Sequence, residues 1–275
     1  MRKLVLLMVV LVSGLFLSAC GSKTQYEVKE GNTLTIGLEA AYAPFNWMTQ
    51  TANEFTVPLN GQPGAYVDGY DVMVATRIAE ELGLNLVIKA IEWDGLIQAL
   101  LSNQIDLIIA GMSPTADRAT TVNFSNEYYR SEQVIVVQKD SALTTVTSIN
   151  DLSGKKAVAQ LGTLQIDLID QIPNVVKLTA LESYGAITQA LRSGQADLFI
   201  AELPVAQSIT ASNSDLTYVS FTEGNGFVVS DEDVTIAAAV RKRDTALLEA
   251  INGVLAGISV ETRNAWMTAV LERQN

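Results

Sequence analysis

Residues 98–110 read QALLSNQIDLIIA and residues 189–201 read QALRSGQADLFIA, so the two stretches align when the chain is shifted by 91 positions. Nine of the thirteen aligned positions are identical. Each copy has the apolar spacing of a helix, then a turn of small and polar residues, then an apolar strand. The repeat predicts two similar α/β lobes, although unrelated segments can also converge on a common helix-turn-strand pattern.

The chain before and within the first copy alternates strand and helix patterns. Residues 34–38 are typical of a strand, and residues 71–82 have the apolar spacing of a helix. A second strand is expected at 84–90, a short helix at 93–101 and a third strand at 106–110. The third strand is nearly all apolar, as are strands that are buried on both faces of a parallel sheet. This alternation indicates βαβ units and an α/β fold.

Composition excludes several classes of function. The chain has 275 residues, 48% hydrophobic and 17% charged, which is enough for one large domain or two lobes. Eighteen Lys and Arg against 30 Asp and Glu give a formal net charge of −12, so we expect no nucleic-acid partner. The sequence has no histidine, which removes Ser-His-Asp catalysis and His-ligated zinc. We expect no metal and no cofactor.

The N-terminus has the pattern of a signal peptide. Arg2 and Lys3 precede an apolar stretch at 4–17 that is too short for a comfortable transmembrane helix. The sequence LSAC, which ends at the only cysteine, Cys20, resembles a bacterial lipobox. Residues 1–20 are then a lipoprotein signal peptide, and Cys20 is the lipidated first residue of the mature chain. The alternative is a buried free thiol in an N-terminal helix.

Residues 21–31 are polar and have no hydrophobic period. We expect them to form a flexible tether that holds the folded part off a membrane surface. The protein is therefore expected outside the cytoplasm, lipid-anchored at the outer face of the cell membrane, or in the periplasm if the source is Gram-negative.

The residues that follow the two repeated strands suit the charged ends of a small ligand. Ligands of parallel sheets bind beyond the carboxyl ends of the strands, which sets the segment that begins at Gly111 opposite Glu202. Ser113, Thr115 and Arg118 supply two hydroxyls and a guanidinium. Beside a glycine whose N–H can approach an anion closely, this set suits a carboxylate.

Two further features complete this interpretation. Gly162 and Thr163 offer a second set of donors where a strand meets a helix N-terminus. Glu202 offers an anion for an ammonium group, so a free α-amino acid fits a site between the lobes. The repeated Asp106 and Asp197 lie at the opposite end of their strands, and we expect them to fix the strand start.

Five stretches between residues 39 and 129 resemble, in order, signatures of the polar amino-acid solute-binding proteins of ABC importers, the bacterial extracellular solute-binding family 3. They are EAAYAPF (39–45), GYDV (69–72), WDGLIQAL (93–100), IDLIIAGMSPTADR (105–118) and FSNEYY (124–129). The resemblance implies a two-lobed periplasmic-binding-protein fold of type II. Each lobe would have a mixed, mostly parallel sheet flanked by helices, with a ligand cleft between the lobes.

The resemblance also implies a ligand-binding set. The matching residues are Glu39, Tyr42, Trp93, Gly111, Met112, Ser113, Thr115, Arg118, Gly162, Thr163 and Glu202. Arg118 would pair with the α-carboxylate of the substrate, and Glu202 would take its α-ammonium. Tyr42 and Trp93 would sandwich the side chain, and Glu39 would meet its polar end.

The expected organisation follows from the same resemblance. Residues 32–135 and 230–275 would form lobe 1, and residues 136–229 would form lobe 2. Residues 132–139 should carry the chain into the second lobe, and residues 226–233 should bring it back. A monomer of this kind would close on its amino acid by a hinge rotation and dock on a membrane permease with its ATPase.

Three departures from the family pattern affect the site. The ammonium position is commonly Asp in the family and is Glu202 here, which is one methylene longer. Residues 47–67 form a longer segment than usual, with a hairpin-type turn that could lie over the mouth of the cleft. Ala110 and Gly111 stand where some relatives have serines, so side-chain donors are fewer.

Structural roles compete with these assignments. Tyr42 and Trp93 could be core aromatics, because large aromatic side chains are often buried for packing. Arg118 could form a surface ion pair with Asp117 or Glu127, which would stabilise the fold little.

The nature of the substrate is left open by the sequence. Glu39 with two aromatic rings favours a basic amino acid such as arginine or lysine, but a carboxylate can also accept from an amide, as in glutamine. A dehydratase-like enzyme with Glu202 or Glu39 as acid/base, and a sensor component, are the other classes considered. The lipobox and tether favour an importer component, and we expect no enzymatic activity.

Overall fold

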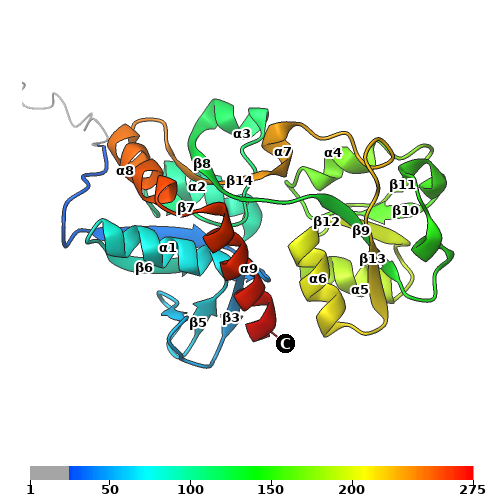
Figure 1. The fold of residues 1–275 in the computed structure, drawn as a ribbon, viewed down its shortest axis with the longest axis horizontal. Coiled ribbons are helices and arrows are strands. Elements are labelled where there is room, and N and C mark those ends of the chain that lie inside the picture. The colour runs from blue at the N-terminus through cyan, green and yellow to red at the C-terminus, as the bar shows by residue number, and fades with distance from the viewer. Residues whose placement is uncertain (1–24, 275) are drawn as a thin grey trace, which may run out of the picture.

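The computed structural model describes residues 25–274, and it shows two α/β lobes lying side by side (Figure 1). Each lobe is built on a five-stranded sheet with helices packed against it, which confirms the predicted two-lobed α/β fold. Cys20, the predicted signal peptide and the start of the tether lie outside the described residues.

The sheet of the first lobe has the order β6-β1-β7-β14-β8. Its strands are β1 (Thr33–Leu38), β6 (Asn85–Ala90), β7 (Leu107–Ile108), β8 (Val122–Arg130) and β14 (Thr235–Arg241). β1 pairs in parallel with β6 and β7, whereas β14 runs antiparallel to both its neighbours, so four of the five strands share one direction. The associated helices are α1 (Tyr70–Glu81), α2 (Leu96–Leu101), α3 (Ala116–Thr121), α7 (Asp231–Val234), α8 (Thr245–Ala256) and α9 (Val260–Gln274).

The sheet of the second lobe has the order β11-β10-β12-β9-β13. Its strands are β9 (Gln133–Gln138), β10 (Lys156–Val158), β11 (Val176–Lys177), β12 (Leu198–Glu202) and β13 (Leu216–Val219). Here β9 is the reversed strand, so this sheet repeats the arrangement of the first. Its helices are α4 (Gln165–Ile169), α5 (Tyr184–Arg192) and α6 (Leu203–Ser212).

The repeated sequence occupies equivalent places in the two lobes. α2 leads into β7 and α5 leads into β12, and each of these strands is the third in its sheet. Asp106 accepts a hydrogen bond from the N–H of Thr35 at 3.1 Å, and Asp197 accepts one from the N–H of Lys156 at 2.8 Å. Each aspartate therefore ties the start of its own strand to the neighbouring strand, Asp106 at the third residue of β1 and Asp197 at the first residue of β10.

Two connections join the lobes. The chain leaves β8 for β9 through Ser131 and Glu132, and it returns between β13 and α7. The N–H of Ser131 donates to the carbonyl oxygen of Val234 at 2.9 Å, so the two connections lie side by side. β9 and β14, the reversed strands of the two sheets, are the strands reached by these connections.

A small third sheet extends from the first lobe (Figure 1). It has the order β2-β3-β5-β4, with β2 (Ala41–Tyr42), β3 (Asn46–Thr49), β4 (Val57–Pro58) and β5 (Tyr66–Asp68). The N–H of Asn60 donates to the carbonyl oxygen of Ile88 at 2.8 Å, which holds this sheet against β6. The four cavities described between the lobes contain no residue of 47–67 in their lining.

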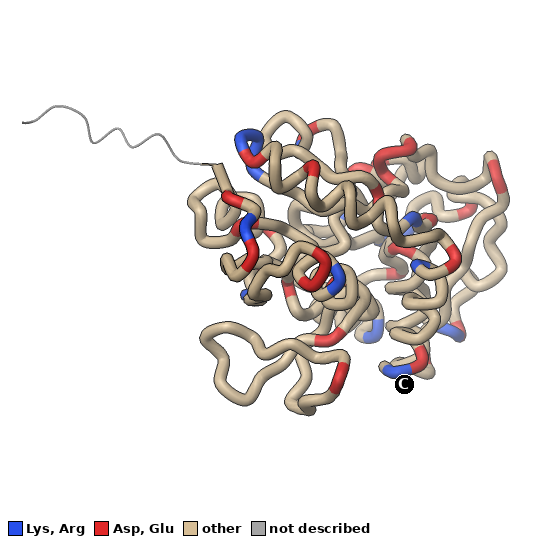
Figure 2. The backbone as a smooth tube through the Cα atoms, turned by 60° about the vertical axis from the view of Figure 1, so that its left-hand side comes forward, with Lys and Arg blue, Asp and Glu red and all other residues tan. Residues whose placement is uncertain are grey.

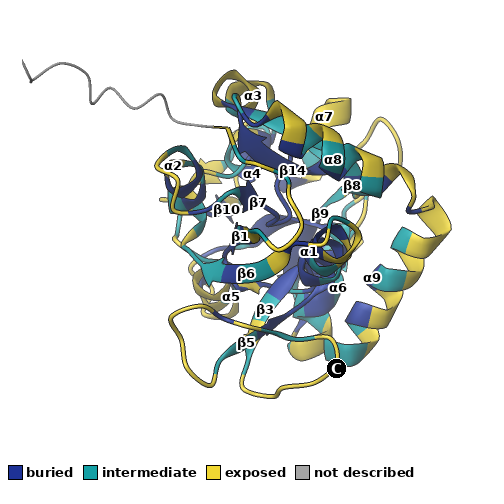
Figure 3. Ribbon diagram, turned by 90° about the vertical axis from the view of Figure 1, so that its left-hand side faces the viewer, coloured by how far each residue is buried: buried dark blue, intermediate teal, exposed yellow. Residues whose placement is uncertain are grey.

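The central strands form the cores of the lobes. Figure 3 shows β1, β7 and β14 largely buried, whereas α9 is largely exposed. Acidic residues occur along the backbone of both lobes (Figure 2). Within residues 25–274, every helix is too short or too polar to span a lipid bilayer.

Candidate functional site

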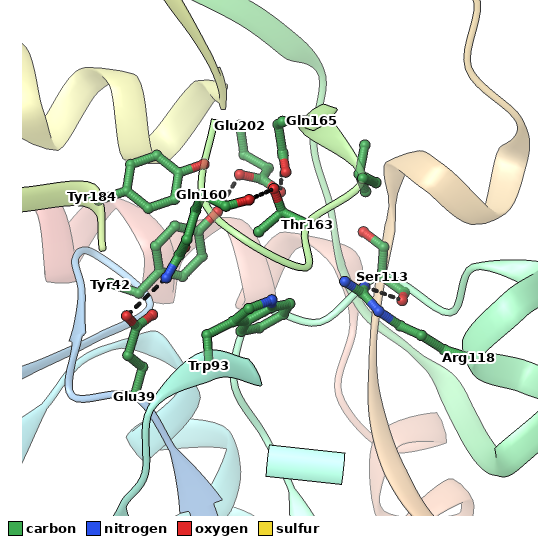
Figure 4. A pocket seen from close by; sticks show the side chains of 12 residues that line it. Glu39, Tyr42, Trp93, Ser113, Arg118, Gln160, Thr163, Gln165, Tyr184 and Glu202 are labelled. Carbon is green, nitrogen blue, oxygen red and sulfur yellow. Dashed lines mark hydrogen bonds between the residues drawn. The ribbon is translucent and has the colours of Figure 1, made fainter. Parts of the chain in front are cut away.

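A cavity with about 300 Å³ of empty volume lies between the lobes, beyond the carboxyl ends of their central strands (Figure 4). Glu39 and Gly111 follow β1 and β7 of the first lobe, whereas Gln160 follows β10 and Glu202 ends β12 of the second. The cavity is lined by Glu39, Tyr42, Trp93, Gly111, Ser113, Arg118, Gln160, Thr163, Leu164, Gln165, Tyr184 and Glu202.

The structure brings most of the predicted ligand-binding residues together in this one cavity. Those that line it are Glu39, Tyr42, Trp93, Gly111, Ser113, Arg118, Thr163 and Glu202. The guanidinium of Arg118 and the carboxyl of Glu202 therefore face the same space, although they belong to different lobes.

Three predicted residues do not line the cavity. Met112 is 1% exposed because its side chain packs into the apolar core of the first lobe. Thr115 caps α3, and its Oγ1 accepts from the N–H of Arg118 at 3.5 Å. Gly162 lies in the adjoining groove, where its carbonyl oxygen accepts from Nε1 of Trp93 at 3.1 Å.

Four lining residues were not predicted; one of them can be found from the sequence repeat and a second from hydrogen bonds of the structure. Tyr184 occupies the position equivalent to Trp93 at the shift of 91. The hydrogen bonds of the two repeated aspartates align Thr35 with Lys156, a shift of 121, and the same shift aligns Glu39 with Gln160. No repeat signal identifies the other two, which are Leu164 and Gln165.

Among the described residues 25–274, the guanidinium of Arg118 donates hydrogen bonds only to backbone carbonyl oxygens. Nη1 donates to the oxygen of Ser113 at 2.9 Å and Nη2 donates to the oxygen of Gly162 at 3.0 Å. Among residues 25–274, the expected alternative of an ion pair with Glu127 is not formed, because Glu127 pairs with Arg130. Burial lowers the pKa of Arg118, although a guanidinium stays protonated at neutral pH.

Glu202 presents a carboxylate that is 4% exposed. It accepts hydrogen bonds from the hydroxyl of Tyr42 and from Nε2 of Gln165, the latter at 3.0 Å. Burial raises the pKa of Glu202, and these hydrogen bonds oppose the shift. No described cation forms an ion pair with this carboxylate within residues 25–274.

Glu39 lies at the other end of the cavity and is 9% exposed. Its Oε1 accepts from Nε2 of Gln160 at 2.9 Å. The pKa of Glu39 is raised to about 7, mainly by burial; the hydrogen bond from Gln160 opposes this shift, and the nearby carboxylates of Glu92 and Asp94 add to it. A cation that enters this end of the cavity would favour the charged form of Glu39.

Aromatic rings form the walls between these charged groups (Figure 4). The ring centroids of Tyr42 and Tyr184 are 5.0 Å apart, and Phe45 stacks on Tyr42 from within the core. The guanidinium carbon of Arg118 lies 5.0 Å from the ring centroid of Trp93. Tyr42 and Trp93 thus contribute to the cavity wall, and Tyr42 also packs on the core.

Side chains of this site hold the two lobes together. In the part of the chain that the structure describes, four side-chain hydrogen bonds cross the cleft: Tyr42 to Glu202, Gln160 to Glu39, Trp93 to Gly162 and Arg118 to Gly162. The structure is therefore a closed form in which the cavity is enclosed by both lobes.

The charged groups of the cavity are one guanidinium and two carboxylates. They can meet a carboxylate at Arg118 and one positive group at each of Glu202 and Glu39. Within residues 25–274, no group of three or more Asp, Glu, Cys or His side chains is placed to hold a metal ion.

Comparisons with known proteins identify relatives over nearly the whole chain. The family model of the bacterial extracellular solute-binding proteins, family 3, matches residues 34–267. The arginine-binding extracellular protein ArtP of Bacillus subtilis is 31% identical over 260 residues, which cover 93% of this chain and 92% of that protein. A probable histidine-binding protein of Campylobacter jejuni is 30% identical over 230 residues, 82% of this chain and 85% of that protein.

A solved structure shares the fold. It is that of the amino acid ABC transporter substrate-binding protein AbpA from Streptococcus pneumoniae bound to L-arginine, with a TM-score of 0.74 and 27% sequence identity. The alignment covers 88% of this chain and 96% of that chain.

Proposed function

This chain belongs to family 3 of the bacterial extracellular solute-binding proteins, and from that premise we propose that it captures a free basic amino acid, arginine above all, for the membrane permease of an ABC importer. The reported relatives bind amino acids, and this chain is likewise a binding protein and not an enzyme. The dehydratase-like alternative has no further support.

The charge of the cavity is the observation that carries the choice of a basic amino acid. Arg118, Glu202 and Glu39 together have one negative charge more than positive when all three are ionised. Arginine has an α-carboxylate, an α-ammonium and a guanidinium, so it supplies the opposite charge at each of the three. A neutral amino acid would leave a buried carboxylate without a positive partner, which costs free energy.

The two α-groups of the ligand are assigned to Arg118 and Glu202. The guanidinium of Arg118 would exchange its bond to the Gly162 carbonyl for a stronger one to the ligand carboxylate. Glu202, held by Tyr42 and Gln165, would accept from the α-ammonium. Both groups are common to all amino acids, so they give affinity and no discrimination between side chains.

The side chain of the ligand is assigned to the end of the cavity that contains Glu39 and Gln160. Nε2 of Gln160 donates to Glu39 and to the carbonyl oxygen of Glu182 at 3.0 Å, so both of its N–H groups are used. This leaves acceptor oxygens on Glu39 and Gln160 to meet the ligand. A guanidinium has only donors and fits, whereas the carbonyl oxygen of a glutamine side chain would face acceptors. Trp93 adds a ring face for the cation.

Capture follows from the two-lobed arrangement. The sequence placed the lobe boundary at residue 135, but β9 (Gln133–Gln138) pairs with β12 of the second lobe from Gln133 onward. We therefore propose that residues 32–130 with 230–275, and residues 133–229, move as two units about the connections at Ser131–Glu132 and between β13 and α7. A ligand that touches Arg118 on one lobe and Glu202 on the other favours the closed state, because only that state makes both contacts.

The cellular location of the protein is proposed from the sequence. Cys20 would bear a lipid that keeps the protein beside its permease, outside the cytoplasm, and residues 21–31 would act as the tether. This residue lies outside the described part of the chain. Mass spectrometry of the membrane-extracted protein would test the assignment, which requires a diacylglyceryl mass on a chain that begins at Cys20.

Isothermal titration calorimetry on the mature protein tests the proposed ligand. We expect saturable binding of L-arginine, weaker binding of L-lysine, and at least about tenfold weaker binding of L-citrulline, which has the shape of arginine without its charge. The variant Glu39→Gln should reduce the preference for arginine over citrulline. Equal affinity for arginine, citrulline and glutamine would reject the proposal of a basic substrate.

A further inference from the structure

Asp71 is a buried carboxylate that does not line the cavity. It lies in the first turn of α1, within the GYDV motif, and its exposed fraction is 0%. Its two oxygens accept from two different side chains, Tyr128 and Asn46. Each of these side chains continues to a backbone N–H group beside the ligand cavity, so Asp71 is the centre of a hydrogen-bonded network with two arms.

The first arm leads to the segment that carries the Arg118 end of the site. The hydroxyl of Tyr128 donates to Oδ1 of Asp71 at 2.7 Å. The hydroxyl oxygen of Tyr128 in turn accepts from the N–H of Gly111 at 3.1 Å. Gly111 lines the cavity, and the carbonyl oxygen of Ser113, two residues further on, accepts from the guanidinium of Arg118. This arm therefore supports the part of the site assigned to the α-carboxylate.

The second arm leads to the segment that carries Glu39. Nδ2 of Asn46 donates to Oδ2 of Asp71 at 2.7 Å, and Oδ1 of Asn46 accepts from the N–H of Ala40 at 2.7 Å. Ala40 directly follows Glu39, the acidic group at the side-chain end of the cavity. This arm therefore supports the part of the site assigned to the ligand side chain.

Both arms end on residues in the left-handed backbone conformation. The φ angle is +59° at Ala40 and +61° at Gly111. A Cβ atom at Gly111 would lie 2.8 Å from Cε1 of Tyr42, so this segment also packs tightly on a ring of the cavity wall. L-residues such as alanine adopt this conformation only where surrounding contacts hold them in it.

We propose that Asp71 is a positioning residue, which sets the Gly111 end and the Glu39 end of the ligand site through its separate hydrogen bonds to Tyr128 and Asn46. This inference rests on the proposed function. A carboxylate suits the role because both neighbours donate to it, and it can accept on both oxygens. An amide at this position would turn an NH₂ group toward one of the two donors.

The two arms make different predictions, which separate a positioning role from a purely structural one. Tyr128→Phe removes the hydrogen bond to Gly111. It should lower the affinities for arginine and for citrulline by the same factor, about tenfold, since both ligands have the α-carboxylate. Asn46→Ala cuts the arm to Ala40 and should lower the ratio of arginine to citrulline affinity by about tenfold, because Glu39 loses its placement.

Tyr70→Phe is the matched control. The hydroxyl of Tyr70 is buried in the same core and donates to the backbone oxygen of Tyr128 at 2.8 Å, outside the two arms. This variant should lower the melting temperature and leave both affinities unchanged. If Asn46→Ala does not fold, Asp71→Asn keeps the size of the side chain and should change the affinities through at least one arm.

Titration calorimetry measures the affinity of each variant for L-arginine and L-citrulline, and thermal melting measures its stability. Unequal effects of Tyr128→Phe and Asn46→Ala on the arginine-to-citrulline ratio support the positioning role. Variants that melt earlier but keep wild-type affinities for both ligands overturn it. A wild-type protein that does not prefer arginine to citrulline rejects the proposed function instead, so the two failures can be told apart.

Discussion

At the scale of single residues, Arg118 is the group to which we assign the α-carboxylate of the ligand. Its guanidinium donates to two backbone oxygens and lies over the ring of Trp93. We predict that Arg118→Ala weakens the binding of every amino acid by about 2 to 5 kcal/mol, since it removes the partner of a buried α-carboxylate. Calorimetric titration with arginine and lysine should show equal losses for the two ligands.

Arg130→Ala is the control for this prediction. Arg130 is an exposed arginine of the same lobe that pairs with Glu127 and Asp231. Exposed pairs contribute little, so the affinity should not change. If Arg118→Ala binds arginine as tightly as the wild type does, the carboxylate is bound elsewhere.

Single residues also show how far the sequence predicts the site. Arg118 and Glu202 were predicted to face each other because they follow equivalent strands, and both line one cavity. Thr115 was grouped with them by its nearness in sequence, but a hydroxyl at the start of a helix caps the helix instead. Gln160 could be identified as the equivalent of Glu39 only from the structure, because the hydrogen bonds of the two aspartates show that the first strands of the two lobes align at a shift of 121.

At the scale of elements, the aspartate at the start of each repeated strand holds that strand against its neighbour by a hydrogen bond. Asp197 accepts from the N–H of Lys156 at 2.8 Å and so joins the start of β10 to the chain just before β12. We predict that Asp197→Ala lowers the free energy of unfolding by roughly 0.5 to 1.5 kcal/mol, because it removes a solvent-exposed hydrogen bond whose acceptor water can replace. Chemical denaturation measures this loss.

The arginine affinity of Asp197→Ala should equal that of the wild type, since the residue lies at the opposite end of the strand from the cavity. Glu223→Ala, at an exposed position, should change neither stability nor affinity. A wild-type unfolding free energy for Asp197→Ala would show that the bond to Lys156 contributes nothing to the lobe.

Several elements could not be predicted from local pattern. The expected strand at 106–110 is reduced to β7 (Leu107–Ile108), because β14 pairs with it only at Ile108. The expected helix at 93–101 begins as a 3₁₀ turn, Trp93–Gly95, before α2. The third sheet depends on pairing with the edge of the first lobe through Ile88, a contact that no periodicity within 47–67 indicates.

The whole molecule has a pH dependence that originates in its buried carboxyl groups. Burial raises the pKa of Glu39 and of Asp71 to about 7, and it also raises that of Glu202. In the unfolded chain, such groups titrate near about pH 4. Between about pH 4 and 7 the folded protein therefore binds more protons than the unfolded chain, so its stability falls as the pH rises.

Exposed acidic groups do not cancel this trend. Asp215 and Asp231 have a lowered pKa because of hydrogen bonds from Arg192 and Arg130. Since their folded-state pKa lies below the unfolded value, their contribution is complete above about pH 4 and is lost only in more acidic solution. The slope between about pH 4 and 7 is therefore set by the buried groups.

We predict that the ligand-free protein melts at a higher temperature at about pH 5 than at about pH 7.5, as measured by scanning calorimetry. Saturating arginine should reduce this difference, because its ammonium and guanidinium hold Glu202 and Glu39 ionised in the complex and bind best when both are charged. Glu39→Gln should flatten the slope of the free protein, since one of the titrating groups is gone. A free protein whose melting temperature rises across this range would contradict the prediction, since its folded state would then bind fewer protons than the unfolded chain between these pH values.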